Sequence, residues 1–166
     1  MKKHRKGHDH QKWRIEARAA RTLVEHLNRH EHPPRYQLGP HREAPDYSLR
    51  VLTGIFAWHF VGLEVTHLYA SGQAAAKLNG SVPPPDRGLP APTLDARRAR
   101  LDAAIADKNA KFAAYTLKPC WLLICNADAG ISAPMWRDYL AGRDFSDSPY
   151  AKIWLIADGR HLINIK

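Results

Sequence analysis

The sequence has no long apolar run and only two cysteines. Its longest apolar stretches, such as WLLIC at 121–125, are far shorter than the roughly 20 residues of a membrane span. The N-terminal residues MKKHRKGHDHQKW have no apolar segment behind their charges. Cys120 and Cys125 have neither CxxC spacing nor a histidine at a zinc-finger interval, which is typical of buried thiols in a reducing compartment. We therefore expect a cytoplasmic protein that does not cross a membrane.

Acidic residues are scarce relative to basic ones. The chain has 25 Lys and Arg against 16 Asp and Glu, a net charge of +9. Much of the excess lies in residues 1–42, which carry eleven Lys and Arg and four acids. Such a segment favours a polyanionic partner, in the first place nucleic acid. A basic tail that only keeps the protein in solution is the alternative.

The 166 residues suit a single domain that buries its own core. We expect a basic disordered tail at 1–11 and one domain over 12–166, with a Pro/Gly-rich connection at 71–93. Apolar periodicity predicts a mixed α/β sheet flanked by helices. The expected elements are a helix to about residue 30, a loop to 45, a hairpin of 46–51 with 55–68, a helix from 94 to about 115, a buried strand at 121–127, a short helix at 134–140 and a closing hairpin around 158–159.

Charged residues occupy the apolar faces of both long predicted helices. At about 100° per residue, Glu16 falls between Leu23 and Leu27 on the apolar stripe of the first helix. Lys108 falls at the centre of the stripe of the second helix, and Lys111 lies at its edge. We therefore expect Glu16 and Lys108 to point toward the sheet.

Two further acids lie on the predicted strands. Glu64 is in the middle of the apolar stretch VGLEVTHL, where an unpartnered carboxylate would cost several kcal/mol or lose its charge. Asp46 follows Pro45 at the start of the preceding strand. Neighbouring strands would bring the two carboxylates side by side, which requires a cation or a shared proton. Carboxylates suit Mg²⁺, and a nearby ammonium would stabilise charge on a phosphate or orient the attacking water.

These residues resemble the motif of the PD-(D/E)xK nuclease superfamily, which includes many restriction endonucleases. The family core is a helix, a β-hairpin or three-strand meander, a helix and a further strand. Pro45-Asp46 corresponds to the PD of the motif, Glu64 to its second acid and Glu16 to an acid that many members carry on the first helix. Thr66 stands where the family has its lysine. Some branches carry that lysine on the following helix, where this chain has Lys108 and Lys111.

The resemblance implies a restriction-endonuclease-like core and a nuclease that cleaves nucleic acid, with DNA as the expected substrate, using Mg²⁺ or Mn²⁺. Asp46, Glu64 and Glu16 would hold the metal. Lys108, or Lys111 in its place, would act on the attacking water. The basic N-terminal segment would contact the nucleic-acid backbone, and a homodimer is left open.

Each of these residues also has a purely structural interpretation. Glu64 and Lys108 would serve equally as a buried ion pair, Asp46 as the end of a loop, and Glu16 as a residue at the rim of the core. His67 follows Glu64 on the predicted strand, but strand alternation sends it to the opposite face. We expect the other histidines to lie on the polar surface or in the tail, and none of the ten to have a metal-binding role. A noncatalytic member of the same fold that binds nucleic acid or protein is the competing function.

Overall fold

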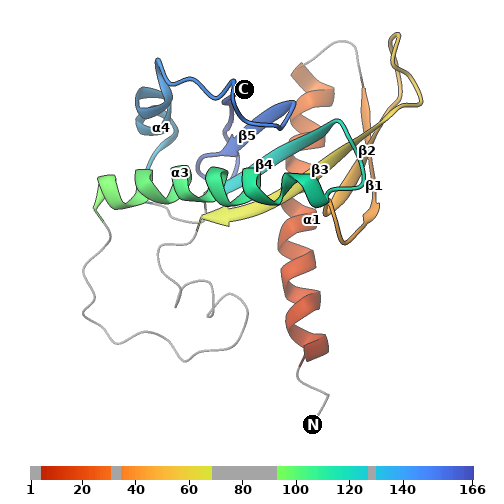
Figure 1. The fold of residues 1–166 in the computed structure, drawn as a ribbon, viewed down its shortest axis with the longest axis horizontal. Helices are drawn as coiled ribbons and strands as arrows, with labels where there is room; N and C mark the ends of the chain where they lie inside the picture. Colours follow the sequence, from red (N-terminus) through yellow and green to blue (C-terminus); the bar gives the residue numbers. More distant parts are fainter. Residues whose placement is uncertain (1–4, 31–34, 69–92, 127–129) are drawn as a thin grey trace.

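A computed structural model describes residues 5–30, 35–68, 93–126 and 130–166, with the side chains of the first helix described from Lys12 onward. Within these residues it has an α/β fold with a six-stranded mixed open sheet and three helices (Figure 1). The helices are α1 (Arg5–His30), α3 (Leu94–Lys111, followed by a 3₁₀ turn, Phe112–Ala114) and α4 (Ala133–Leu140). The strands are β1 (Tyr36–His41), β2 (Tyr47–Val51), β3 (Phe60–Leu68), β4 (Cys120–Asn126), β5 (Lys152–Ile156) and β6 (Leu162–Asn164).

The strands lie in the sheet in the order of the sequence, β1 to β6. Strands β1, β2 and β3 form an antiparallel meander, β3, β4 and β5 run parallel, and β6 returns antiparallel to β5. The crossover from β3 to β4 carries α3, as parallel neighbours require. Every residue of β4 is buried, which confirms its predicted central position.

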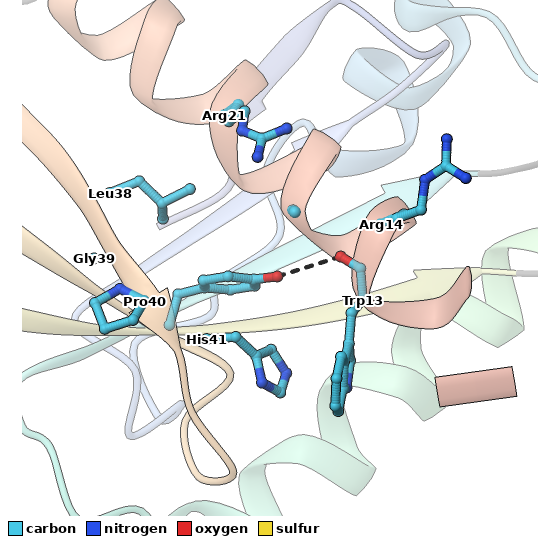
Figure 2. Close-up of a pocket in the computed structure, with 9 residues that line it drawn as sticks. Trp13, Arg14, Arg21, Leu38, Gly39, Pro40 and His41 are labelled. Atoms are coloured by element: carbon cyan, nitrogen blue, oxygen red, sulfur yellow. Dashed lines mark hydrogen bonds between the residues drawn. The ribbon is translucent and has the colours of Figure 1, made fainter. Parts of the chain in front are cut away.

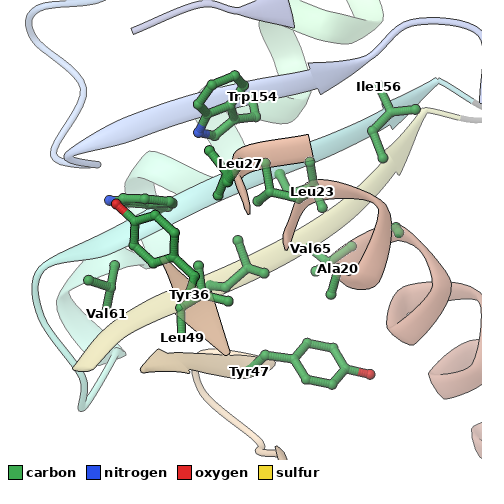
Figure 3. Close-up of a cluster of buried hydrophobic side chains, with 14 of the residues drawn as sticks. Ala20, Leu23, Leu27, Tyr36, Tyr47, Leu49, Val61, Val65, Trp154 and Ile156 are labelled. Atoms are coloured by element: carbon green, nitrogen blue, oxygen red, sulfur yellow. The ribbon is translucent and has the colours of Figure 1, made fainter. Parts of the chain in front are cut away.

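The helices cover the two faces of the sheet separately. On one face, Ala20, Leu23 and Leu27 of α1 pack against a buried set that includes Leu49, Val65, Trp154 and Ile156 (Figure 3). On the other face, Leu101 and Ile105 of α3 and Trp136 of α4 pack against residues such as Leu122, Ile124 and Leu155. Alternate residues of β3 therefore face different helices, with Val65 toward α1.

The predicted start of the second long helix at residue 94 and the predicted closing hairpin are confirmed. Thr93 caps α3, its hydroxyl accepting a hydrogen bond from the amide of Ala96 at 3.2 Å. The closing hairpin is formed by β5 and β6. None of the helices in the described residues is long and apolar enough to cross a bilayer. Most of the predicted connection at 71–93 lies outside the described residues.

The segment expected to be a loop before residue 45 contains a strand, β1, at the edge of the sheet. Its sequence, YQLGPH, includes Gly39 and Pro40, which are rare inside strands but tolerated at an edge. A Cβ on Gly39 would lie 2.3 Å from the Ser48 hydroxyl, so the glycine allows β2 to approach closely. Because Gly39 and Pro40 are more typical of a turn, the sequence pattern does not predict this strand.

Helix α1 begins at Arg5, earlier than the expected start near residue 12. Residues 5–11 therefore belong to the helix rather than to a separate tail, whereas residues 1–4 lie outside the described ones. This first part of α1 runs past the edge of the sheet (Figure 1). The sequence of residues 5–11 has no apolar stripe, so its periodicity does not predict a helix there.

Candidate metal and catalytic site

Strands β2 and β3 bring Asp46 and Glu64 together. Tyr47 pairs with Leu63, so Asp46, one residue before Tyr47, lies at the level of Glu64 on the neighbouring strand. Both are largely buried, with 9% and 6% of their surface exposed. The amide of Val65 donates a hydrogen bond of 2.8 Å to Oδ2 of Asp46, which fixes this carboxylate against β3.

Gly62 makes this arrangement possible. A Cβ at this position would lie 2.7 Å from both Cγ of Pro45 and the backbone oxygen of Leu117, and 3.0 Å from Sγ of Cys120. Only a residue without a side chain lets the segment before Asp46 and the segment before β4 approach β3 together. The glycine thus places the Pro-Asp turn next to the strand that carries Glu64.

Helix α3 supplies a cation to Glu64. Nζ of Lys108 lies 2.5 Å from Oε1 of Glu64, and the lysine side chain is only 18% exposed. Glu64 also interacts with the hydroxyl of Tyr115, whose pKa is raised chiefly by burial and then by the neighbouring carboxylate. The expectation that Lys108 faces inward is confirmed, and Glu64 has partners for its charge.

Helix α1 supplies a third buried carboxylate, from the opposite side of the sheet to α3. Glu16 is 3% exposed, so it is not at the rim of the core. Its Oε1 lies 3.5 Å from Nζ of Lys12, a side chain that is itself 60% exposed. Its Oε2 is buried and has no hydrogen-bond partner among the described residues. A buried carboxylate oxygen of this kind calls for a partner, which an ion or a water molecule outside the chain would supply.

His41, at the end of β1, completes a group with these acids. Glu16, His41 and Asp46 each offer a ligand atom, and these atoms all lie within 4.8 Å of one another. The imidazole is held between Trp13 and Tyr47, with ring centroids 4.9 and 5.3 Å away. The sequence pattern does not predict β1, and therefore gives no reason to expect a histidine near the acids. The pairing of β1 with β2 brings His41 next to Asp46.

The pKa values of the two acids in the group are raised, chiefly by burial and then by the neighbouring carboxylates. Burial raises the pKa of Asp46 to about 6, with further contributions from the charges of Glu64 and Glu16. Burial also raises the pKa of Glu16, against the opposing effect of Lys12. The pKa of Tyr47 rises to about 12 through burial and the same two acids, Glu16 and Asp46. A bound cation would offset this accumulation of negative charge.

The five predicted site residues therefore fall into three groups. Asp46 and Glu16 lie together with His41, and Glu64 lies beside Asp46 but holds Lys108. Lys111 is not brought to the site, because its Nζ binds Oδ2 of Asp107 at 2.7 Å and its side chain is 61% exposed.

The residues present suit a divalent cation. Two carboxylates and an imidazole, with one carboxylate oxygen that has no partner among the described residues, make a ligand set for a transition metal such as Mn²⁺ more readily than an all-oxygen magnesium site. Lys108 lies close enough to the carboxylates of Asp46 and Glu16 for its positive charge to lower their pKa values, against the larger effect of burial. No protein-family model, curated protein or solved structure significantly matches this chain.

Proposed function

We propose that the protein is a metal-dependent nuclease that hydrolyses phosphodiester bonds in nucleic acid, with DNA as the expected substrate. The observation that carries this proposal is the gathering of Glu16, His41 and Asp46 within 4.8 Å beside the buried Glu64–Lys108 pair. Carboxylates that need a cation and an ammonium next to them are the parts that phosphodiester hydrolysis requires.

The order of the elements supports the same proposal. Helix α1, the meander β1–β3, helix α3 and the parallel strand β4 follow the order of the core implied by the resemblance to PD-(D/E)xK nucleases. Asp46 immediately precedes the second strand, Glu64 lies in the third, and Glu16 lies on the first helix, in line with that resemblance. Lys108 on α3 replaces the lysine absent at Thr66.

The proposed roles follow from the contacts. Glu16, His41 and Asp46 would hold a divalent cation, which would supply Lewis-acid stabilisation of charge on the phosphate. Glu64 is a positioning residue, because its Oε1 is occupied by Lys108. The Lys108 ammonium orients the attacking water and stabilises charge on the phosphate. The water oxygen attacks phosphorus and the bond to the leaving oxygen breaks. The attacking water gives its proton to bulk solvent, and the leaving oxygen takes a proton from solvent.

A nicking assay on supercoiled plasmid and on single-stranded DNA tests the proposal, with Mn²⁺, Mg²⁺ or EDTA. We expect cleavage with Mn²⁺, weaker cleavage with Mg²⁺ and none in EDTA. Asp46→Asn keeps the size of the side chain and should lower the rate by at least about a hundredfold, the scale of lost metal-site support. Asp107→Asn is the matched control, since it removes an exposed acid whose ion pair among the described residues is with Lys111.

Two outcomes would contradict the proposal. Equal cleavage by wild type and Asp46→Asn would show that the activity comes from elsewhere. Absence of cleavage by wild type under every metal condition, with nucleic acid still bound, would favour a noncatalytic binding protein. The buried Glu64–Lys108 pair would then have only a structural role.

A further inference from the structure

A cleft of about 480 Å³ opens beside the candidate metal site, between α1 and the meander (Figure 2). It shares His41 and Tyr47 with the surroundings of the buried acids. Its volume is within the range of about 300–1,000 Å³ that is usual for small-molecule sites. The residues that line it are Trp13, Arg14, Ala17, Arg21, Leu38, Gly39, Pro40, His41 and Tyr47.

One wall of the cleft is aromatic. The rings of Trp13, His41 and Tyr47 follow one another, with centroids 4.9 and 5.3 Å apart. The hydroxyl of Tyr47 donates a hydrogen bond of 3.4 Å to the backbone oxygen of Trp13, which ties α1 to β2 at this point (Figure 2). Trp13 remains 41% exposed. A flat aromatic ligand would find a preformed surface here.

The cleft is also cationic. Arg14 and Arg21 are seven residues apart on α1, close to two helical turns, so both lie on the side that borders the cleft. None of the described residues that line it is acidic. The charge of Arg21 lowers the pKa of Tyr47, against the larger effect of burial, which places the guanidinium near the aromatic wall. An anionic group attached to the flat ligand would therefore be held as well.

We propose that this cleft binds one unpaired nucleotide of the substrate strand, next to the phosphate that is cleaved. The inference rests on the proposed nuclease function and names the form of nucleic acid that the site takes. The base lies against Trp13, His41 and Tyr47, and its phosphate contacts Arg21 and Arg14. Because His41 belongs both to the cleft and to the candidate metal group, the next phosphate along the strand lies at the carboxylates.

This assignment has a consequence for the substrate. A base can enter the cleft only when it has left the stack of a duplex, so single strands, flaps and frayed ends are favoured over intact duplex. Stacking on an aromatic ring tolerates any base. We therefore expect little sequence preference, in agreement with a sequence that contains no base-recognition motif.

Binding of a fluorescein-labelled single-stranded oligonucleotide, followed by anisotropy in EDTA at about 0.15 M salt, tests the proposal without requiring cleavage. We expect Trp13→Ala to weaken binding by about 5- to 150-fold, the scale of one lost base stack. Trp13→Phe should restore most of the affinity. Arg21→Gln should lower the salt slope by about one, as expected for the loss of one phosphate contact.

Arg29→Gln is the matched control, because Arg29 is an exposed arginine of the same helix outside the cleft. We expect it to change the affinity by less than about twofold at this ionic strength. Equal losses for Arg21→Gln and Arg29→Gln would show diffuse attraction and overturn the proposal. So would unchanged binding by Trp13→Ala with a native circular dichroism spectrum, or equal affinity for blunt duplex and single strand.

The two proposals fail in different ways. Wild-type cleavage with unaltered oligonucleotide binding by both cleft variants would overturn the nucleotide cleft and leave the nuclease function in place. Cleft-dependent binding without any metal-dependent cleavage would overturn the nuclease function instead. Displacement of the oligonucleotide by polyglutamate at equal charge concentration would show that the cleft does not select a base, and would also overturn the inference.

Discussion

The candidate site has two halves, Glu64 on the α3 side and Glu16 with Asp46 on the α1 side. The two halves differ in how far the chain itself neutralises their buried carboxylates. On the α3 side, Glu64 has the ammonium of Lys108 at 2.5 Å and the hydroxyl of Tyr115 as partners. On the α1 side, Glu16 and Asp46 have an exposed lysine and one backbone amide. The chain therefore neutralises one carboxylate itself and leaves two others short of positive charge.

This difference separates a structural explanation from a functional one. A buried ion pair is satisfied within the chain, and the Glu64–Lys108 pair alone needs no ligand to explain it. Two acids whose pKa values are both raised, one of them with an oxygen lacking a partner, are unfavourable in the protein alone. Buried groups that lower the stability of the protein in this way are typical of binding sites and catalytic sites. The α1 half is therefore the stronger indication of function.

The largest expected effect on stability comes from removing the cation that neutralises Glu64 in the α3 half. Lys108→Met leaves the Glu64 carboxylate buried without its cation, and we expect the free energy of unfolding to fall by about 3–5 kcal/mol. Urea denaturation in EDTA measures this change. Lys111→Met is the control, because it breaks an exposed pair with Asp107 that is worth about 0–1 kcal/mol. Similar small losses in the free energy of unfolding for Lys108→Met and Lys111→Met would mean that Lys108 does not stabilise the buried Glu64 carboxylate.

An opposite and smaller effect is expected in the unsatisfied half. Asp46→Asn keeps an oxygen that can accept the hydrogen bond from Val65 and removes the uncompensated charge. We expect the variant to be more stable than wild type at pH 8 in EDTA by on the order of 1–3 kcal/mol. Urea denaturation again provides the measurement, and a loss of stability at pH 8 would contradict the raised pKa of Asp46.

The pH dependence of this difference follows from the raised pKa. The folded Asp46 carboxyl has a pKa of about 6 against 3.8 for the ordinary group, so the folded protein binds its proton more tightly than the unfolded chain. Ionisation therefore costs stability above pH 6, and that cost is recovered as the pH falls from 6 toward 4. The advantage of Asp46→Asn should shrink over this range and be nearly lost at pH 4.

Much of the α3 half could be predicted from the sequence. Glu64 interrupts an apolar strand and Lys108 interrupts an apolar helical stripe, so both anomalies are visible in the periodicity alone. Glu16 was predicted to face inward by the same reasoning, and its 3% exposure confirms that. Buried charges stand out because they break a regular pattern of hydrophobic residues.

The missing part was the contribution of β1. Gly39 and Pro40 conceal an edge strand, and without that strand His41 belongs to a loop with no defined position. The signal that could have found it is the alternation of Tyr36 and Leu38 before the turn residues, followed by a histidine close in sequence to Asp46. The cleft depends on the same strand, because its aromatic wall forms only when β1 pairs with β2.

The smallest expected effect tests whether His41 belongs to the unsatisfied half. Mn²⁺ at ten times its dissociation constant should stabilise the wild type by about 1.4 kcal/mol through binding to the folded state alone. If His41→Ala weakens metal affinity tenfold, the same Mn²⁺ concentration stabilises the variant by only about 0.4 kcal/mol. Thermal unfolding with and without Mn²⁺ gives the difference.

His59→Ala is the control for this last comparison, because His59 is an exposed histidine on the turn between β2 and β3, outside the group of ligand atoms. It should keep the full stabilisation by Mn²⁺. Equal stabilisation of wild type, His41→Ala and Asp46→Asn would mean that the metal binds elsewhere, and the two halves of the site would then differ only in packing. A loss confined to His41 and Asp46 would identify the α1 half as the part that takes its positive charge from outside the chain.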